Sequence, residues 1–552
     1  MVKRTWNFVD KFSSEDELQS YIVQNTVSIK RTEEIEAGKK VIYRCSKYRK
    51  YPECDFQVKV IFSHDGGVTV STSNEHDHAH RAATTRAPSP VREIVKNSVA
   101  AGLSCIQTRR AIEHQYQGGV SRSQLCSLLN YHRSLAVPDI HFVDDFRSWC
   151  HQHSALAVGP TAIHEPFVAK FYINSCNDIF VFITTRKLIS TAPLSGMLQV
   201  DATFKLNWNE LPVLVFGSSD GNRRFFPYGI AVIGTDEAAS SYITLFQTVK
   251  ECVFNVTGLQ YNVQYLMADG GKGITTAQQF ELPNCRRLMC WSHAIRKIRQ
   301  HRKMIPVEKW RGIERDISTL QLSFNDNIFQ KGSSLLLTKW KSDPELFMFA
   351  NYFEQTWLLD LKFWYEGAAI GYPLTNNGLE SLNNRIKQQY TLRNKLPLPK
   401  FISTMDTMLR EWSRKTAEDE FQTYPKISVE IEKQAWKWLK DLNKNSIFHW
   451  HSYSYIVPST SNKDYSSSLW LQEYATFPWK KFEDFSKWFY AGRLVTLPMM
   501  CSCKTNLKTY VCKHAVGISI HFGLYIISDP NKLESLGKRR GRPKKAGPAL
   551  SC

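Results

Sequence analysis

The stretch Gly196-Met197-Leu198-Gln199-Val200-Asp201-Ala202-Thr203-Phe204 is an apolar run that closes on an acid. A second run, Tyr265-Leu266-Met267-Ala268-Asp269-Gly270, has the same form. Short apolar runs bounded by turn residues are typical of buried strands, so Asp201 and Asp269 are expected at strand ends. Further strands are predicted at residues 179–183, 211–216 and 225–232, and a helix at 235–252. This alternation predicts a mixed α/β core.

A third acid, Glu380, lies early in a predicted helix, Thr375-Asn376-Asn377-Gly378-Leu379-Glu380-Ser381-Leu382-Asn383-Asn384-Arg385. Carboxylates from two strand ends and one helix can hold two divalent ions about 3.5–4 Å apart, an arrangement suited to phosphodiester chemistry. Such ions prefer oxygen ligands. A single acid at a strand end is usually a solvated turn residue, but this ordered set favours a site. We predict that Asp201, Asp269 and Glu380 are catalytic and bind two Mg²⁺ or Mn²⁺ ions.

The chain is strongly basic: 71 Lys and Arg against 51 Asp and Glu give 552 residues a formal net charge of +20. This balance suits a polyanionic partner such as double-stranded DNA. Simple solubility is the alternative, and the clustering of cations in residues 272–303 and 537–547 speaks against it. Lys272, Arg296 and Lys297 are expected to contact DNA phosphates.

The chain shows no apolar run approaching the roughly 20 residues that span a bilayer, and its start lacks the apolar segment of a signal peptide. We therefore expect an intracellular protein without a membrane partner or a nucleotide cofactor. In a reducing compartment its 13 cysteines should be thiols or metal ligands.

Two cysteine and histidine clusters have the composition of structural Zn²⁺ sites. Near the C-terminus the spacing is Cys-x-Cys-x8-Cys-x-His, with candidate ligands Cys501, Cys503, Cys512 and His514. Near the N-terminus the candidate ligands are Cys45, Cys54, His76 and His78. His80 is an alternative ligand there, and a solvated histidine-rich turn is the alternative to the whole site.

Helices and strands are also predicted outside the core. The alternation at 56–62 and 67–70 predicts a hairpin, and 91–135 predicts short helices, either a helix-turn-helix or an ordinary connector. Residues 294–370 and 395–445 are expected to be helical, 446–530 to return to short strands and loops, and the Gly/Pro/Lys/Arg-rich end to be disordered.

The elements Asp-Ala-Thr-Phe-Lys (201–205), Met-Ala-Asp-Gly (267–270), Cys-Trp-Ser-His (290–293) and Thr-Asn-Asn-Gly-Leu-Glu-Ser-Leu-Asn (375–383) together resemble the catalytic domain of Mutator-like element transposases, of the RNase H-like DDE type. The resemblance implies that Asp201, Asp269 and Glu380 are the metal-binding triad and that an all-α insertion precedes the glutamate. It also implies cut-and-paste transposition, with cleavage and strand transfer at terminal inverted repeats by a homodimer or larger assembly.

Cys290 and His293 resemble the C(2)H signature of this and related superfamilies, and are possible accessory catalytic residues. Two ligands cannot complete a tetrahedral zinc site, so packing with a hydrogen bond is the favoured role of Cys290. His293 and Trp291 are expected near scissile DNA, with Trp291 stacking on a displaced base.

Three further resemblances concern DNA binding. The C-terminal cluster resembles a SWIM zinc finger, and the N-terminal one resembles FLYWCH and WRKY-type zinc domains. The tail Lys538-Arg539-Arg540-Gly541-Arg542-Pro543-Lys544-Lys545 resembles an AT-hook, whose Arg540 and Arg542 would enter an A·T minor groove. The same run suits a nuclear localisation signal, which predicts a nuclear protein; a solubilising tail is the alternative.

The predicted regions are a zinc DNA-binding domain (1–85), a helix-turn-helix-like segment (91–135), the first part of an RNase H-like core (136–293), an all-α insertion (294–370), the last core helices (371–445), a SWIM-type region (446–530) and a basic tail (531–552). A domesticated DNA-binding transcriptional regulator is the alternative to a transposase, and a nuclease that cleaves without joining is a third possibility.

Overall fold

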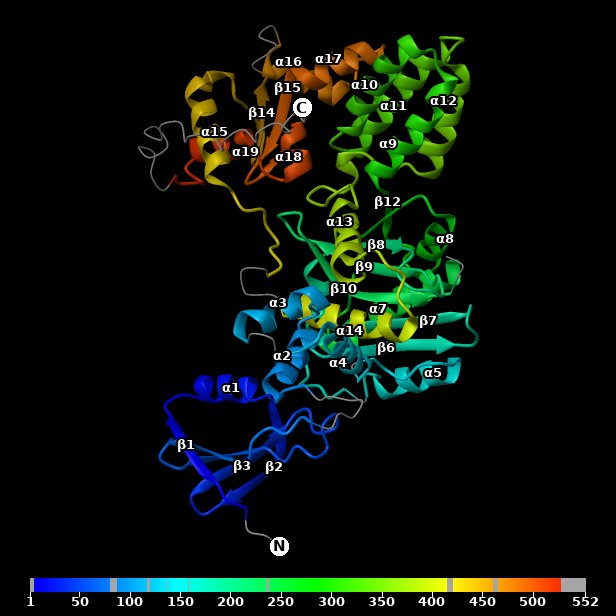
Figure 1. Cartoon of the computed structure of the whole chain (residues 1–552). Helices are drawn as coiled ribbons and strands as arrows, with labels where there is room; N and C mark the ends of the chain where they lie inside the picture. Colours follow the sequence, from blue (N-terminus) through cyan, green and yellow to red (C-terminus); the bar gives the residue numbers. More distant parts are fainter. Residues whose placement is uncertain are drawn as a thin grey trace, which may run out of the picture. The chain divides into compact units, whose positions relative to one another are not determined.

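The computed structural model describes residues 4–79, 87–116, 120–135, 137–156, 158–234, 238–414, 420–459 and 465–527. The chain forms two compact units, Met1–Pro138 and Asp139–Cys552, which are drawn in Figure 1. The AT-hook-like tail with Arg540 and Arg542, the alternative ligand His80 and the start of the helix predicted at 235 lie outside the described residues.

The first unit begins with an antiparallel sheet in the order β1-β5-β4-β3-β2. Its strands are β1 (Asn7–Phe12), β2 (Val27–Ile35), β3 (Gly38–Cys45), β4 (Gln57–Ser63) and β5 (Val68–Ser73), and α1 is Glu15–Gln24. The predicted hairpin is confirmed, because β4 pairs with β5. Leu18 and Ile22 of α1 pack with Val58, Val60 and Val70 in one apolar core.

Three helices complete this unit: α2 (Ser89–Ala100), α3 (Cys105–Gln115) and α4 (Arg122–Leu135). They confirm the helices predicted at 91–135. Val91 and Val95 of α2 pack against Ile112, Leu129 and Val23, the last from α1. The helices therefore share apolar contacts with α1 and belong to the same compact unit; the helix-turn-helix stays a prediction.

The second unit is built on a seven-stranded mixed sheet in the order β12-β11-β8-β9-β10-β7-β6. Its strands are β6 (Pro166–Ile173), β7 (Ile179–Thr185), β8 (Met197–Thr203), β9 (Val213–Ser219), β10 (Phe225–Ile233), β11 (Tyr265–Ala268) and β12 (Arg286–Met289). β11 runs parallel to β8 and to β12, and the other pairs are antiparallel. The five predicted strands are confirmed, while β6 and β12 were not predicted.

Helices cover both faces of this sheet, as its fully buried central strands require. On one face α7 (Ala239–Thr257) and α8 (Lys272–Glu281) pack on the strands. On the other face lie α5 (Val143–Gln152), α13 (Asn377–Arg385) and α14 (Leu398–Ser413). A short helix, α6 (Arg186–Ile189), and a 3-10 turn, Ala192–Leu194, connect β7 to β8. The predicted mixed α/β architecture is therefore present.

An all-α region follows β12. It contains α9 (Trp291–Gln300), a 3-10 turn (His301–Met304), α10 (Val307–Gln321), α11 (Asp326–Lys341), α12 (Phe347–Phe353), a π-helical segment (Glu354–Asp360) and a 3-10 turn (Glu366–Ala368). This confirms the helices expected at 294–370. Its apolar core is rich in aromatic side chains, including Trp340, Trp357 and Trp364.

The expectation of strands and loops for 446–530 is wrong in part. The structure has β13 (Phe448–His451), β14 (Ser454–Pro458), β15 (Gly492–Thr496) and β16 (Met500–Cys501), but also α16 (Ser467–Thr476), α17 (Phe482–Ala491), α18 (Lys504–Thr509) and α19 (Lys513–His521). Trp470, Phe485 and Trp488 of α16 and α17 complete the core of the all-α region. Their apolar spacing was a helical signal that the prediction missed.

The remaining part is a small α/β layer. Its four strands lie in the order β13-β14-β15-β16, and α15 (Val429–Asp441) and α19 pack on them. A π-helical segment, Ile386–Tyr390, follows α13, and a 3-10 turn, Lys444–Ser446, follows α15. The helices expected at 395–445 are present as α14 and α15. Within the described ranges, no helix combines the length and the apolar character needed to cross a membrane.

Candidate active site and metal centres

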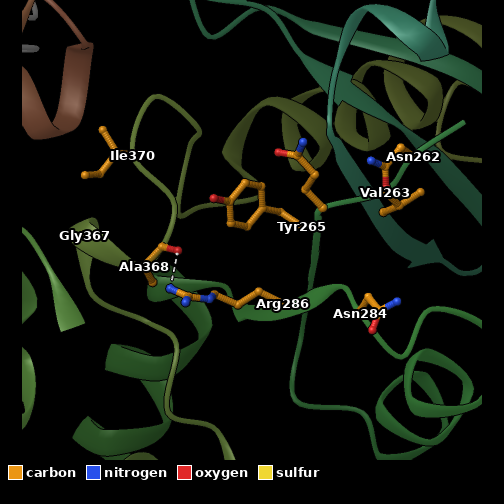
Figure 2. A pocket seen from close by; sticks show the side chains of 9 residues that line it. Asn262, Val263, Tyr265, Asn284, Arg286, Gly367, Ala368 and Ile370 are labelled. Atoms are coloured by element: carbon orange, nitrogen blue, oxygen red, sulfur yellow. Dashed lines mark hydrogen bonds between the residues drawn. The ribbon is translucent and has the colours of Figure 1, made fainter.

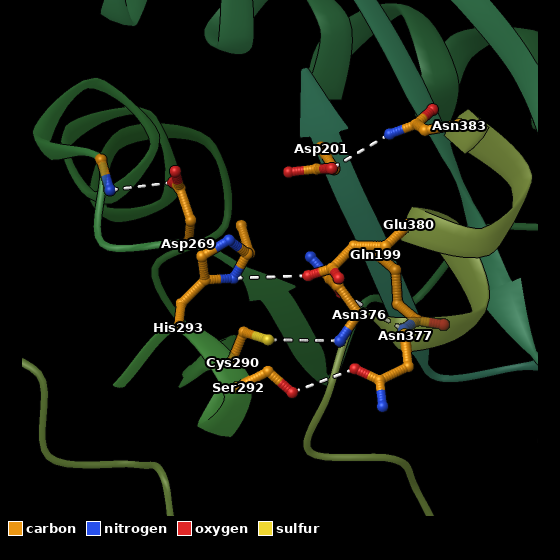
Figure 3. A network of polar contacts seen from close by, with 12 residues as sticks. Gln199, Asp201, Asp269, Cys290, Ser292, His293, Asn376, Asn377, Glu380 and Asn383 are labelled. Carbon is orange, nitrogen blue, oxygen red and sulfur yellow. Dashed lines mark hydrogen bonds and ion pairs between the residues drawn. The ribbon is translucent and has the colours of Figure 1, made fainter. Parts of the chain in front are cut away.

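Asp201 and Asp269 come from neighbouring parallel strands. β8 carries Asp201 near its end, and Asp269 directly follows β11. The register pairs Tyr265 with Met197 and Met267 with Gln199, so continuing it by two residues places Asp269 opposite Asp201. Adjacent strands lie about 4.8 Å apart. The two acids predicted at strand ends therefore lie on the same edge of the sheet (Figure 3).

Glu380 reaches this edge from α13. Asn383, one turn further along the same helix, donates a 3.0 Å hydrogen bond from Nδ2 to Oδ2 of Asp201. Because residues three apart share one helix face, Glu380 also faces the strand ends. α13 packs on β8, β9 and β10. Figure 3 shows Glu380 extending from this helix toward His293.

A buried amide network fixes the start of α13. Asn376 donates from Nδ2 to the carbonyl of Val200 at 3.3 Å and accepts from Nε2 of Gln199 at 3.4 Å. Gln199 in turn accepts from the Ser219 hydroxyl at 2.7 Å. Asn376 is fully buried and Asn383 nearly so, so these two asparagines position the acids from within. Neither the network nor the role of Gln199 was predicted.

Cys290, His293 and Glu380 form a group in which one ligand atom from each lies within 4.8 Å of the others. Cys290 caps α9, and His293 lies in the first turn of that helix. Nδ1 of His293 is 3.7 Å from Oε1 of Glu380. Both atoms are buried and make no hydrogen bond with any described residue. A cation bound between the two atoms would therefore give both a polar partner.

Among the described residues, the ligand atoms of Asp201, Asp269 and Glu380 do not all lie within 4.8 Å of one another. A two-ion site does not require it. Ions about 3.5–4 Å apart, with ligand oxygens about 2.1 Å from each, hold carboxylates at larger separations. The structure thus brings Asp201, Asp269 and Glu380 to one edge, with His293 beside Glu380.

A backbone N–H of the loop after β11 holds the carboxylate of Asp269. Gly271 donates its N–H to Oδ1 of Asp269 at 3.0 Å. A Cβ at Gly271 would lie 3.1 Å from that oxygen and crowd it. Below the loop, Arg287 donates to the carbonyl of Asp269. Burial lowers the pKa of the Arg287 guanidinium to about 10, and the charge of Asp269 opposes this shift.

The residues expected to contact DNA have mixed surroundings. Arg296, Lys297 and Lys272 are exposed, as phosphate contacts require. Trp291 instead stacks on Trp364, with ring centroids 5.5 Å apart. One face of the Trp291 indole is therefore covered, which leaves only the other for a displaced base.

The N-terminal cluster is assembled. Ligand atoms of Cys45, Cys54, His76 and His78 all lie within 4.8 Å of one another. Sγ of Cys45 is 3.4 Å from Nε2 of His78, and Sγ of Cys54 is 3.4 Å from Nδ1 of His76. Tetrahedral zinc with Zn–S of about 2.3 Å and Zn–N of about 2.0 Å separates such atoms by about 3.6 Å. The donor set and spacing fit Zn²⁺.

The histidines of this cluster are held as metal ligands usually are. Nε2 of His76 lies 2.9 Å from the carbonyl of Asn25, which leaves Nδ1 as the free lone pair. His78 stacks on Tyr51 at a centroid distance of 4.2 Å. Burial lowers the pKa of both histidines, and the neutral imidazole that this favours is the form that binds a metal.

The C-terminal cluster is assembled as well, from Cys501, Cys503, Cys512 and His514. Nδ1 of His514 lies 3.8 Å from the sulfurs of both Cys501 and Cys512. Cys503 and Cys512 are the N-caps of α18 and α19. Their sulfurs accept backbone N–H groups from Asn506 and Ala515 at 3.4 Å, and such donors stabilise thiolates.

Contacts link this cluster to the start of α13. Arg223 donates to the carbonyl of Lys508 in α18, and its guanidinium carbon lies 5.9 Å from the centre of the Tyr510 ring. The same side chain reaches Oγ1 of Thr375 at 3.5 Å. The C-terminal cluster and the residues before Glu380 therefore share one arginine.

A polar pocket of about 660 Å³ lies at the other ends of β11 and β12 (Figure 2). Arg286 lines it and already donates to the carbonyl of Ala368 at 3.0 Å and to Asp326 at 3.2 and 3.1 Å. Since Asp269 follows the opposite end of β11, this pocket is separate from the acids.

Comparison with known protein families gives a match in the central part of the chain. A family model described as MULE transposase domain matches residues 197–297. The matched stretch runs from β8 into α9 and contains Asp201, Asp269 and His293, whereas Glu380 lies outside it. No curated protein matches the chain. The central part of this chain is therefore similar to the transposases of Mutator-like elements, a similarity that suggests a transposase-related function and DNA binding.

Proposed function

We propose that this chain is a cut-and-paste DNA transposase with an RNase H-like core. The observation that carries the proposal is the position of Asp201, Asp269 and Glu380. These acids are far apart in sequence but lie at one edge of the sheet. Asp201 and Asp269 are inside the matched domain, and Glu380 is outside it. We propose that residues 294–370, whose described elements are helical from α9 to the 3-10 turn Glu366–Ala368, are the helical insertion that precedes the glutamate.

The three acids are proposed to bind two Mg²⁺ or Mn²⁺ ions. When bound, such ions activate a water or a DNA 3′-hydroxyl and stabilise the leaving oxygen. The protein's own part is to hold the carboxylates still. Asn383 orients Asp201, the Gly271 N–H orients Asp269, and the Asn376 network anchors the helix that presents Glu380.

DNA binding is proposed to involve several parts of the chain. The N-terminal zinc domain, α2 to α4 and the AT-hook-like tail would recognise terminal inverted repeats, and the exposed Lys272, Arg296 and Lys297 would contact phosphates. We propose Zn²⁺ at both Cys/His clusters, a homodimer or larger assembly that pairs two ends, and a nuclear location.

The test is strand cleavage and joining by the full chain. The probe is a labelled duplex carrying the repeats that flank the coding sequence, with Mg²⁺ or Mn²⁺. Asp201→Ala, Asp269→Ala and Glu380→Ala should each lower both steps by at least about a thousandfold, equivalent to several kcal/mol of lost transition-state stabilisation. Glu308→Gln, an exposed acid of α10, should leave both steps unchanged.

Two results would overturn the proposal. Cleavage without joining would indicate a nuclease. Specific DNA binding with neither step in the unmodified chain would indicate a DNA-binding regulator.

A further inference from the structure

We infer that His293 is a fourth metal-binding residue, whose Nδ1 binds the same divalent ion as Oε1 of Glu380. The inference rests on the proposed metal chemistry of this site and assigns a role to a residue outside the acid triad. In this arrangement the ion has one imidazole ligand among its carboxylates.

The distance between the two atoms supports a shared ion. Nδ1 of His293 and Oε1 of Glu380 are 3.7 Å apart. A hydrogen bond between them would require about 2.7–3.2 Å. Two ligands at about 2.1 Å from one ion are separated by about 3.0 Å when they lie at a right angle and about 4.2 Å when opposite. The observed separation falls within that range and outside the hydrogen-bond range.

Burial of the same atoms supports it independently. Both are enclosed, and neither makes a hydrogen bond with a described residue. A buried polar atom left without a partner costs about 1–3 kcal/mol, and more when charged. One divalent cation between the two atoms would satisfy both, because a neutral imidazole nitrogen and a carboxylate oxygen are both electron-pair donors.

Cys290 has a different role in this arrangement. Its side chain is fully buried, and its sulfur accepts the backbone N–H of Asn376 at 3.3 Å. Cys290 is the N-cap of α9 and Asn376 the N-cap of α13. One sulfur therefore joins the starts of the helices that carry His293 and Glu380. Cys290 is a positioning residue, and His293 is the ligand.

An imidazole ligand changes which ions the site prefers. Imidazole nitrogen suits Mn²⁺ and later transition metals better than Mg²⁺, which favours oxygen. The His293 site should therefore bind Mn²⁺ more tightly than Mg²⁺. His293→Ala should reduce the difference between these two affinities.

The experiment measures Mn²⁺ binding to the full, zinc-loaded chain without DNA. Zinc remains in the two Cys/His clusters because it binds such sites more tightly than Mn²⁺. Electron paramagnetic resonance gives the affinity, and its pulsed form detects nitrogen coupled to the bound ion. We expect nitrogen coupling in the unmodified chain. We expect its loss in His293→Ala and His293→Gln, with affinity at least about tenfold weaker.

Matched variants separate ligation from folding. His301→Ala, at the other end of α9, should keep both the affinity and the nitrogen signal. Cys290→Ser should keep the signal, because a hydroxyl can also accept the Asn376 N–H. Circular dichroism reports whether each variant is folded. An unmodified chain without nitrogen coupling, or a folded His293→Gln that retains it, would overturn the inference.

This outcome is distinguishable from failure of the proposed function. Nitrogen-coupled Mn²⁺ in a chain that neither cleaves nor joins DNA would contradict the transposase and leave His293 as a ligand. Cleavage and joining by a chain whose bound Mn²⁺ shows no nitrogen coupling would support the transposase and contradict the assignment of His293 as a ligand.

Discussion

The two Cys/His clusters differ in their donors, two cysteines and two histidines near the N-terminus but three cysteines and one histidine near the C-terminus, and in what surrounds them. The N-terminal cluster joins the end of β3, the loop before β4 and the segment after β5, and its two cysteines belong to the apolar core of that sheet. The C-terminal cluster lies within Cys501 to His514, and its three sulfurs belong to the small apolar core itself.

This difference separates two uses of one metal. In the first unit a zinc ion would pin one end of a sheet that apolar packing already stabilises. Around α18 the ion would replace packing that so short a segment cannot supply, and it would add to the packing of α19 on α15 and the strands. The two clusters are therefore expected to carry different shares of the local stability.

The largest expected effect is loss of the C-terminal site. Cys512→Ser removes a zinc ligand, while its hydroxyl can still accept the Ala515 N–H that caps α19. It should lower zinc content by one ion per chain and unfold α18 and α19 locally. Structural zinc contributes roughly 10 kcal/mol or more to such segments, so amide protection there should collapse. Metal analysis and hydrogen exchange measure this; unchanged protection at 504–521 would remove the contrast between the clusters.

The matched change in the N-terminal site should have a smaller effect. Cys54→Ser should also release one zinc ion, but β2 to β5 should keep their exchange protection because their core remains. We expect a loss of roughly 3 kcal/mol in the free energy of unfolding, within the range of a strongly destabilising substitution. Loss of protection throughout the sheet would show instead that this domain also depends on its metal for folding.

A third change tests the tie between the C-terminal cluster and α13. Arg223→Ala removes the contacts to the Lys508 carbonyl, the Tyr510 ring and Thr375. It should cost about 2 kcal/mol and weaken Mn²⁺ binding near Glu380, with zinc content unchanged. Arg224→Lys, which keeps the charge of the neighbouring residue, is the control. If Arg223→Ala binds Mn²⁺ as tightly as the unmodified chain, the Arg223 contacts do not affect the metal site near Glu380.

The smallest expected effect concerns Glu366, which pairs with Lys508 of α18 at 3.5 Å. Burial raises the pKa of its carboxyl, although Gln321 and Lys508 oppose the shift. Ionisation is thus disfavoured in the folded state, and stability is lost as pH rises through the raised pKa. Glu366→Gln should raise the free energy of unfolding at pH 7 by the order of 1 kcal/mol. The gain should vanish below the ordinary carboxyl pKa.

Denaturant unfolding at pH 7 and at pH 4 or lower measures this difference. A loss of stability at pH 7 would mean that the ion pair with Lys508 outweighs the burial of the carboxylate. The docking of the C-terminal cluster would then depend on that charge.

Local patterns predicted the strands that carry the acids. The runs ending at Asp201 and Asp269 are short, apolar and bounded by turn residues, so their conformation follows from nearby sequence. Ligand spacing likewise predicted which cysteines and histidines come together. In both cases residues close in sequence contain most of the information.

Contacts between distant residues were not predictable in this way. No local pattern indicates that Asn376 is buried against Gln199 and Val200, which lie 177 and 176 positions away. β12 pairs with β11. It was not predicted because Arg286 and Arg287 interrupt the apolar pattern by which buried strands are recognised. Only the assembled sheet reveals why such polar residues are inside.

The all-α region closes its core with side chains made late in synthesis. Phe485 packs so tightly on Gly332 that a Cβ there would lie 2.9 Å from its ring, and Trp470 and Trp488 belong to the same core. The face of α11 that carries Gly332 can therefore be covered only after α17 has left the ribosome. This part of the core waits for a side chain 153 positions further along the chain.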